Sequence, residues 1–134
     1  MAVSYDHYKG VEPGSITTAT GSLRAKVQTS KSKLGTLKGS LSDDIWKASA
    51  KATLLTAFDK IDGEVCQDIL DKLDTADEIA GYITDYNTAK AAALGYKSDI
   101  SNAKEGEDTS GYEAKLAAEE KKMQSAVDSI NGLL

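Results

Sequence analysis

Cysteine, proline, histidine, tryptophan and phenylalanine each occur only once in this chain of 134 residues. The single cysteine, Cys66, excludes an internal disulfide, and its apolar surroundings indicate a small buried side chain. The single proline, Pro13, leaves the rest of the chain without a helix breaker, which favours long helices over a β fold. No apolar run approaches the ~20 residues that a membrane-spanning helix needs, so we expect no stable membrane insertion.

The residue types that carry most enzyme chemistry are also scarce. Only His7 could act as an imidazole base, and it has no cysteine or second histidine near it in the sequence. Neither a glycine-rich phosphate loop nor a zinc-binding histidine motif is present. The stretch Asp59–Glu64 fails as a calcium loop because Ile61 stands where an oxygen ligand is needed. We therefore expect no catalysis, no metal and no cofactor.

Basic side chains do not cluster, and the formal net charge is −5, which argues against binding to nucleic acid. Tyrosines could suggest a platform on which bases stack, but no basic residues accompany them. We expect these tyrosines to lie at core edges with their hydroxyls in water. They are Tyr82, Tyr86, Tyr96 and Tyr112.

A regular apolar stripe begins after Pro13, which closes a loose N-terminal arm over residues 1–13. The stripe follows heptad spacing, which predicts a helix over 15–38. Its positions are Ile16, Thr20, Leu23, Val27, Ser30, Leu34, Leu37 and Leu41. The basic residues on the other faces should be solvated. They are Arg24, Lys26, Lys31, Lys33 and Lys38.

A short elbow separates this helix from the next. Gly39 can end the first helix in a left-handed turn. Ser42 can cap a second helix whose first turn carries Asp43 and Asp44, because carboxylates there meet free N–H groups. So short a link makes the two helices antiparallel. The second stripe has no proline in it and predicts a helix over 43–103, either broken near a glycine or in need of another partner.

A polar loop at 104–111 precedes a third periodic segment, predicted as a helix over 111–131. The expected fold is all-α: an antiparallel helical hairpin with a long second helix and an extra C-terminal helix packed back on it, forming a single domain over 14–134. Side chains near the middle of the long helix should then be the least covered within one chain. These are Ile69, Leu70 and Leu73, and such an open stripe usually marks a partner interface.

The elbow carries a family resemblance. Trp46-Lys47-Ala48 resembles the Trp-x-Gly elbow of WXG-type, ESAT-like proteins, with Ala48 in place of the glycine, and small residues precede Phe58 as in that family's second helix. The pair Phe58 and Asp62 resembles a Phe-x-x-x-Asp element in small helical partners of LXG-type toxins. The resemblance covers about residues 14–90. The chain extends beyond it at the C-terminus, and the tyrosines of the distal helices do not form the mycobacterial export signal.

The resemblance implies a small Gram-positive type VII secretion protein made in the cytoplasm and secreted without a cleaved signal peptide. It would act as a dimer in a four-helix bundle, or as the targeting partner of a larger LXG-type toxin with a helical N-terminal domain, and would meet the secretion ATPase. Its partner-binding residues would be Trp46, Phe58, Asp62, Ile69, Leu70 and Leu73. Trp46 can serve as a recognition group, as a plug for the bundle end, or as both. The alternative is a cytoplasmic coiled-coil adaptor or scaffold unrelated to secretion.

Overall fold

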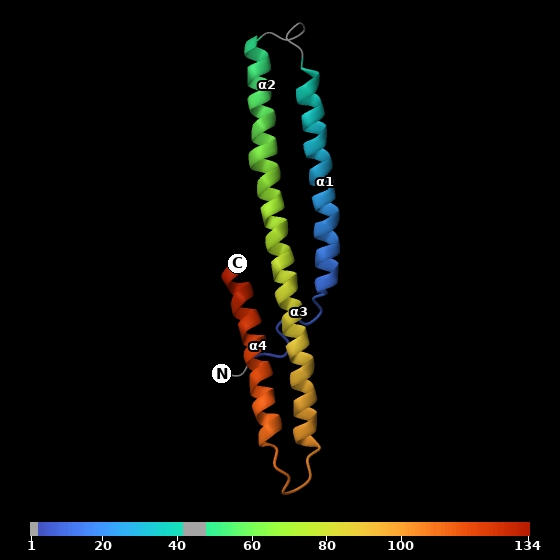
Figure 1. The fold of residues 1–134 in the computed structure, drawn as a ribbon, viewed down its shortest axis with the longest axis vertical. Coiled ribbons are helices and arrows are strands. Elements are labelled where there is room, and N and C mark those ends of the chain that lie inside the picture. Colours follow the sequence, from blue (N-terminus) through green and yellow to red (C-terminus); the bar gives the residue numbers. More distant parts are fainter. Residues whose placement is uncertain (1–2, 42–47) are drawn as a thin grey trace. The chain divides into compact units, whose positions relative to one another are not determined.

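The computed structural model describes residues 3–41 and 48–134, and within these residues it contains helices and no strand (Figure 1). The predicted all-α fold is therefore confirmed. The elements in chain order are α1 (Pro13–Ser40), α2 (Ala48–Lys60), a π-helical segment η1 (Ile61–Cys66), α3 (Gln67–Ser101) and α4 (Ser110–Leu133). The predicted elbow, including Ser42, Asp43, Asp44 and Trp46, lies outside the described residues.

The first helix extends past both of its predicted ends. Pro13 occupies its first turn, where the missing N–H costs nothing because no helical acceptor precedes it. Gly39 does not end the helix in a left-handed turn, as the sequence suggested, because the helix continues to Ser40 and Gly39 does not have a positive φ. Leu41 follows, and its N–H donates to the carbonyl of Lys38 at 3.3 Å in a tightened last turn.

The long second helix does not break at its glycines. α2, η1 and α3 follow one another without an intervening loop from Ala48 to Ser101, two residues short of the predicted end at 103. The segment that departs from α-helical geometry is η1, which contains Gly63. A π turn accommodates more residues per turn than the 3.6 of an α-helix, so it changes the direction of every side chain that follows it.

Two compact units make up the chain. One unit is Ser15–Asp77, which holds α1, α2, η1 and the start of α3. In it, α1 lies beside α2 and α3 and runs antiparallel to them (Figure 1). We call this unit the α1 hairpin. It confirms the antiparallel hairpin that the sequence predicts.

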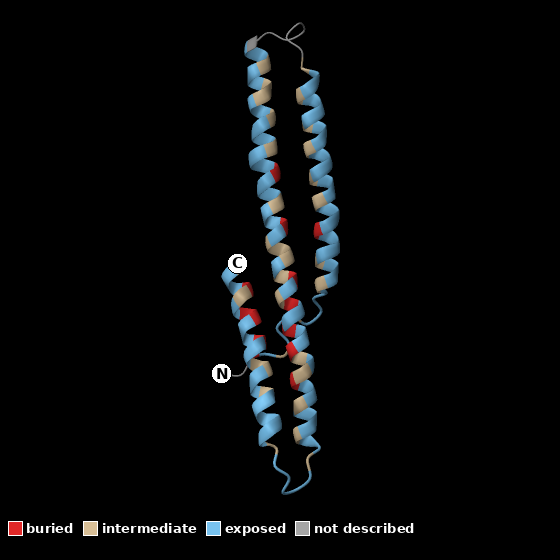
Figure 2. Cartoon of the chain, viewed as in Figure 1, coloured by how far each residue is buried: buried red, intermediate tan, exposed pale blue. Residues whose placement is uncertain are grey.

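The other unit joins Met1–Gly14 to Glu78–Leu134. Here α4 lies beside the distal part of α3, which confirms the C-terminal helix packed back on the long helix (Figure 1). Buried residues face each other across these two helices (Figure 2). The core consists of Val3, Tyr86, Ala89, Ala93, Met123, Ala126 and Val127.

The N-terminal arm is part of this second core, so the prediction of a loose arm is wrong over its described residues. Val3 is buried, and Tyr5 and Tyr8 pack against the same cluster. Tyr86 donates its hydroxyl hydrogen to the Ser4 carbonyl and accepts the His7 N–H at 3.3 Å. Tyr86 is therefore not a core-edge tyrosine with a wet hydroxyl. The arm supplies hydrogen-bond partners for the Tyr86 hydroxyl that the helical periodicity could not indicate.

Candidate functional site

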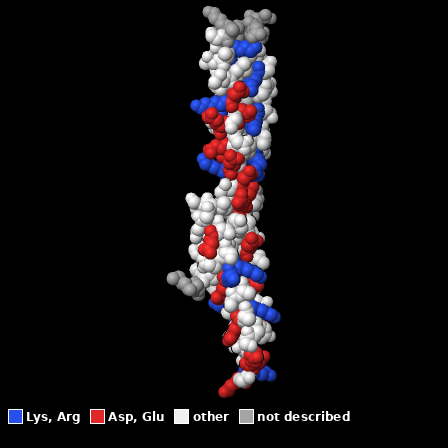
Figure 3. All heavy atoms as spheres, turned by 60° about the vertical axis from the view of Figure 1, so that its left-hand side comes forward, with Lys and Arg blue, Asp and Glu red and all other residues white. Residues whose placement is uncertain are grey.

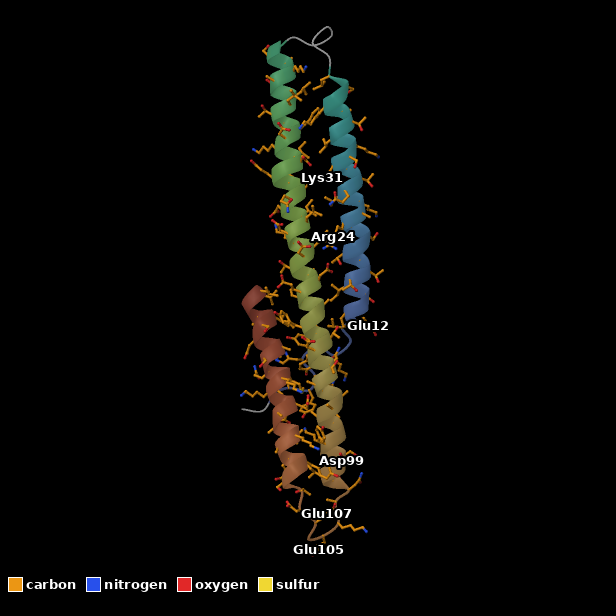
Figure 4. The ribbon with its side chains drawn as sticks, viewed as in Figure 1. Glu12, Arg24, Lys31, Asp99, Glu105 and Glu107 are labelled. Atoms are coloured by element: carbon orange, nitrogen blue, oxygen red, sulfur yellow. The ribbon has the colours of Figure 1, made fainter. Side chains whose placement is uncertain are left out.

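Ion pairs connect α1 to the facing helix along the α1 hairpin, and Figure 4 labels two of the α1 side chains that form them, Arg24 and Lys31. Three basic side chains, spaced seven residues apart on α1, each meet aspartates of the facing helix. The pairs are Arg24 with Asp74 and Asp77, Lys31 with Asp62, and Lys38 with Asp59. The prediction that these three basic residues are simply solvated is wrong, since each is about one-third exposed and faces the seam.

The ion pairs are shorter at the two ends of the hairpin, at Arg24 and at Lys38, than at Lys31 between them. Arg24 Nη2 lies 2.8 Å from Asp74 Oδ1 and 2.9 Å from Asp77 Oδ2, and the buried Thr20 hydroxyl donates to Asp77. Lys31 Nζ lies 3.7 Å from Asp62 Oδ1, which is beyond hydrogen-bond distance. Partly exposed pairs add little stability each, but their order fixes the register of the two helices.

This seam differs from the predicted one by one row of side chains. Thr20, Val27 and Leu34 face the partner helix as expected. The second row of α1 that faces inward consists of the basic residues Arg24, Lys31 and Lys38. The sequence had predicted the adjacent aliphatic row in that place. Leu23 and Leu37 are consequently turned outward, with Ser30 between them in the sequence. The seven-residue spacing of the basic residues, opposite a helix rich in aspartate, is the sequence signal that could have indicated this rotation.

On the facing helix, an exposed aliphatic row passes through η1. Ile61, Val65 and Ile69 are four residues apart, and such a row turns gradually around an ordinary α-helix because four residues exceed one turn. The π turn offsets that drift, since it holds more residues per turn. The three side chains therefore stay on one side of the helix, next to the inward row of Phe58, Asp62 and Cys66.

Both aliphatic rows lie on the same side of the hairpin. On α1, Leu23 and Leu37 come one position before inward basic residues, namely Arg24 and Lys38. On η1, Ile61 and Val65 come one position before the inward residues Asp62 and Cys66. In two antiparallel right-handed helices, the residue one position before an inward-facing residue points to the same side of the pair on both helices. We call this surface the apolar face and define it by Leu23, Leu37, Ile61, Val65 and Ile69, which are 40 to 50 % exposed.

Charged side chains border the apolar face. Lys26 and Lys33 follow its edge on α1, and Glu64 and Asp68 follow its edge on η1 and α3, all of them exposed. Figure 3 shows acidic and basic side chains gathered together over the part of the molecule that contains the α1 hairpin. A wide aliphatic surface with a charged border is the composition expected of a protein-binding surface.

The carboxyl of Asp77 is electrostatically tuned by its neighbours. Hydrogen bonds from Thr20 and then from Arg24 hold the pKa of Asp77 below its ordinary value, while partial burial opposes them. The same contact with Asp77 raises the pKa of Arg24. A carboxyl that is more acidic in the folded chain stabilises the fold fully above its unfolded pKa of about 4.

We expect this contribution of Asp77 to be lost as the pH falls from about 4 through the lowered folded pKa. Replacing Asp77 with asparagine should therefore flatten the pH dependence of stability in that window. Urea unfolding between pH 2 and pH 7, followed by circular dichroism, measures this. Asp99→Asn, at an exposed carboxylate on α3, is the control (Figure 4). An unchanged pH profile for Asp77→Asn would contradict the assignment.

The residues predicted to bind a partner are distributed unevenly. Trp46 lies outside the described residues. Phe58 and Asp62 are half-buried on the seam, where Asp62 pairs with Lys31. Ile69 is on the apolar face, whereas Leu70 is half-buried beside it.

Leu73 was expected among the least covered residues and is instead only 8 % exposed, because it points into the hairpin next to Asp74. The heptad stripe placed Leu23 and Leu37 inside the hairpin, and nothing in the sequence indicated that these two residues, Ile61 and Val65 are exposed. Sequence reasoning did correctly place Cys66, which is a buried free thiol.

Other candidate sites hold little chemistry. Within the described residues, no group of three or more histidine, cysteine, aspartate or glutamate side chains could hold a metal ion. The His7 ring stacks on Tyr8, with centroids 5.4 Å apart. An open groove of about 680 Å³ runs between α3 and α4, lined by small side chains such as Ala89 and Ser125 and by charged ones such as Asp85 and Lys122. Among the described helices, none combines the length and apolar character needed to cross a membrane.

Comparison of the chain with protein-family models, with curated proteins and with solved structures finds no match in any of the three.

Proposed function

We propose that this chain is a non-catalytic helical pairing protein, which binds another helical hairpin through the apolar face. The observation that carries the proposal is the alignment of five large aliphatic side chains, each 40 to 50 % exposed, on one side of the α1 hairpin. Water contact with so much aliphatic surface is unfavourable by about 25 cal/mol per Å². A second hairpin laid on this face would complete a four-helix bundle and remove the surface from water.

The biological setting we propose is type VII secretion. This part rests on the resemblance of Trp46-Lys47-Ala48 and of the Phe58 and Asp62 pair to small secreted partners of that system. In this setting the chain would be exported as a dimer, or as the targeting partner of a larger LXG-type toxin that it accompanies to the secretion ATPase. The second candidate, a cytoplasmic adaptor or scaffold, uses the same apolar face without export.

Export can be tested in a Gram-positive host with an intact or a deleted type VII secretion ATPase. The full chain should appear in the culture supernatant only when the ATPase is present, while a cytoplasmic marker stays in the cells. Trp46→Ala should reduce export, with Tyr112→Ala as a control at an exposed aromatic on α4. Equal amounts of the chain in the supernatants of the host with the intact ATPase and the host without it would exclude the secretion role and leave the adaptor role.

A further inference from the structure

We infer that η1 is a conformational switch within the α1 hairpin. Its π turn holds one surplus residue, and its return to α-helix would exchange the row of α3 that faces α1. In the observed state, the row that contains Cys66 and Leu73 faces α1. In the alternative state, the row that contains Val65 and Ile69 takes its place. The switch itself is independent of the proposed function, and only its consequence for pairing rests on that function.

The surplus residue follows from the spacing of the ion pairs. Arg24 and Lys38 are 14 residues apart on α1, whereas their partners Asp74 and Asp59 are 15 residues apart on the facing helix. Fourteen residues are two heptads, after which a paired helix presents the same side to its neighbour again. The facing helix therefore carries one residue more than α1 does between the same two contacts.

The inward rows of the two helices show the same surplus. On α1, the inward residues Lys31 and Lys38 keep heptad spacing. On the facing helix, Cys66 and Leu73 are seven residues apart, but Phe58 and Cys66 are eight residues apart. The eight-residue step crosses η1, and a π turn accommodates one additional residue within a helix.

A second row of α3 can face α1 if the π turn returns to α-helix. Heptad spacing then continues from Asp62 to the residue three positions on, which is Val65 in place of Cys66. The row that would turn inward consists of Val65, Ile69, Lys72 and Ala76. Val65 and Ile69 are 50 % and 40 % exposed in the observed state, so their burial favours the exchange.

Charges at one end of the hairpin favour the observed row. Lys72 is exposed and pairs with Asp68 on its own helix. In the alternative state its ammonium group would enter the seam two residues from the level of Asp74, close to Arg24. Arg24 would also lose its contacts with Asp74 and Asp77. Repulsion between the two cations and the loss of these pairs therefore disfavour the alternative state.

The middle of the seam opposes the observed row. Among the residues that the structure describes, Asp62 Oδ1 is buried without a hydrogen-bond partner, and Lys31 Nζ lies 3.7 Å from it. A buried acceptor that lacks a hydrogen bond is unfavourable, and a π turn is a rare departure from α-helical geometry. The charges near Arg24 thus act against a cost at η1, and two opposed contributions of this kind allow two conformations.

The exchange changes the apolar face. Ile61 precedes the surplus residue and stays outward in both states, whereas Val65 and Ile69 turn inward in the alternative state. The face is therefore complete only in the observed state. A partner that binds this face would shift the population toward the observed state.

Cys66 provides the readout, because it is the only cysteine of the chain and is 5 % exposed in the observed state. In the alternative state its thiol leaves the seam and can react with iodoacetamide, which mass spectrometry follows on the full chain. Lys72→Leu should accelerate this labelling about tenfold, because leucine gains by entering the alternative row. Lys60→Leu is the control, with the same change at an exposed lysine that belongs to neither row.

Deletion of Gly63 removes the surplus residue and should leave unbroken heptads with the observed rows inside. We expect labelling of Cys66 to slow at least threefold, while the free energy of unfolding does not fall. Deletion of Gly35 is the control, because this glycine of α1 also has open space around it but interrupts a regular row. That deletion should destabilise the hairpin, which urea unfolding followed by circular dichroism measures.

Three results would each overturn the inference. The first is equal labelling of the Lys72→Leu and Lys60→Leu variants. The second is a labelling rate that follows the free energy of unfolding in every variant, since Cys66 would then react only when the whole chain unfolds. The third is a deletion of Gly63 that destabilises the chain as much as the deletion of Gly35. None of these measurements involves export, which tests the proposed function separately.

Discussion

Replacing Tyr86 with alanine is expected to lower the free energy of unfolding by about 3–5 kcal/mol, the range for truncating a large buried aromatic side chain. Tyr86 is only 1 % exposed, and its ring packs edge-on against Tyr8, with centroids 4.9 Å apart. Its hydroxyl joins α3 to the arm through Ser4 and His7. Burial raises the pKa of this hydroxyl above its ordinary value of about 10, so it remains a protonated donor well above neutral pH.

The measurement is urea unfolding at pH 7, followed by circular dichroism. Tyr86→Phe keeps the ring and removes only the hydroxyl, so it should lower the free energy of unfolding by about 0.5–1.5 kcal/mol, the net contribution of a typical hydrogen bond. Tyr112→Ala, at an exposed tyrosine on α4, should be close to neutral. The arm should also become accessible, so tryptic cleavage after the exposed Lys9 should accelerate in Tyr86→Ala. Equal stability of Tyr86→Ala and Tyr112→Ala would refute the role of Tyr86 in the core.

Replacing Leu73 with alanine is expected to destabilise the α1 hairpin by about 2–5 kcal/mol, because the change removes buried methyl groups and leaves a cavity. Leu73 is only 8 % exposed and lies on the side of α3 that faces α1. Among the hairpin residues that the structure describes, the other buried side chains are Thr20 and Cys66. The loss of one leucine therefore removes a large part of its core.

Hydrogen exchange followed by mass spectrometry locates the effect. Amides of α1 should exchange faster in Leu73→Ala, whereas those of α4, in the other unit, should change less. Leu94→Ala, at the half-exposed leucine on α3, serves as the control. It should lower the free energy of unfolding by much less than Leu73→Ala does. Uniform acceleration along the whole chain would instead mean that the two units unfold together.

The apolar periodicity predicted the helices because one face of each helix must leave water, and the absence of internal proline allowed the long helix to form. It also predicted that residues 111–131 fold back on the long helix. The arm could not be predicted this way. Its burial depends on hydroxyl and carbonyl contacts with Tyr86, which join residues 82 positions apart in the sequence.

The candidate site was harder to predict than the fold, as Leu23 and Arg24 illustrate. Both residues are within reach of the hairpin seam, and a heptad pattern alone favours the leucine inside. The aspartates at 74 and 77 draw Arg24 inward instead, and this rotation exposes Leu23. Similarly, no sequence rule gave the π turn that keeps Ile61, Val65 and Ile69 in line.

The sequence by itself determined that the chain is all-helical, that its first two long segments form an antiparallel hairpin, and that Cys66 is buried. These properties follow from local spacing and composition, which act within a few turns of helix. Only the tertiary structure decided which row of each helix faces inward, how the arm packs, and where the chain divides into two units. Those outcomes depend on pairs of side chains that are distant in sequence, and the energy of each pair exists only once the helices have met.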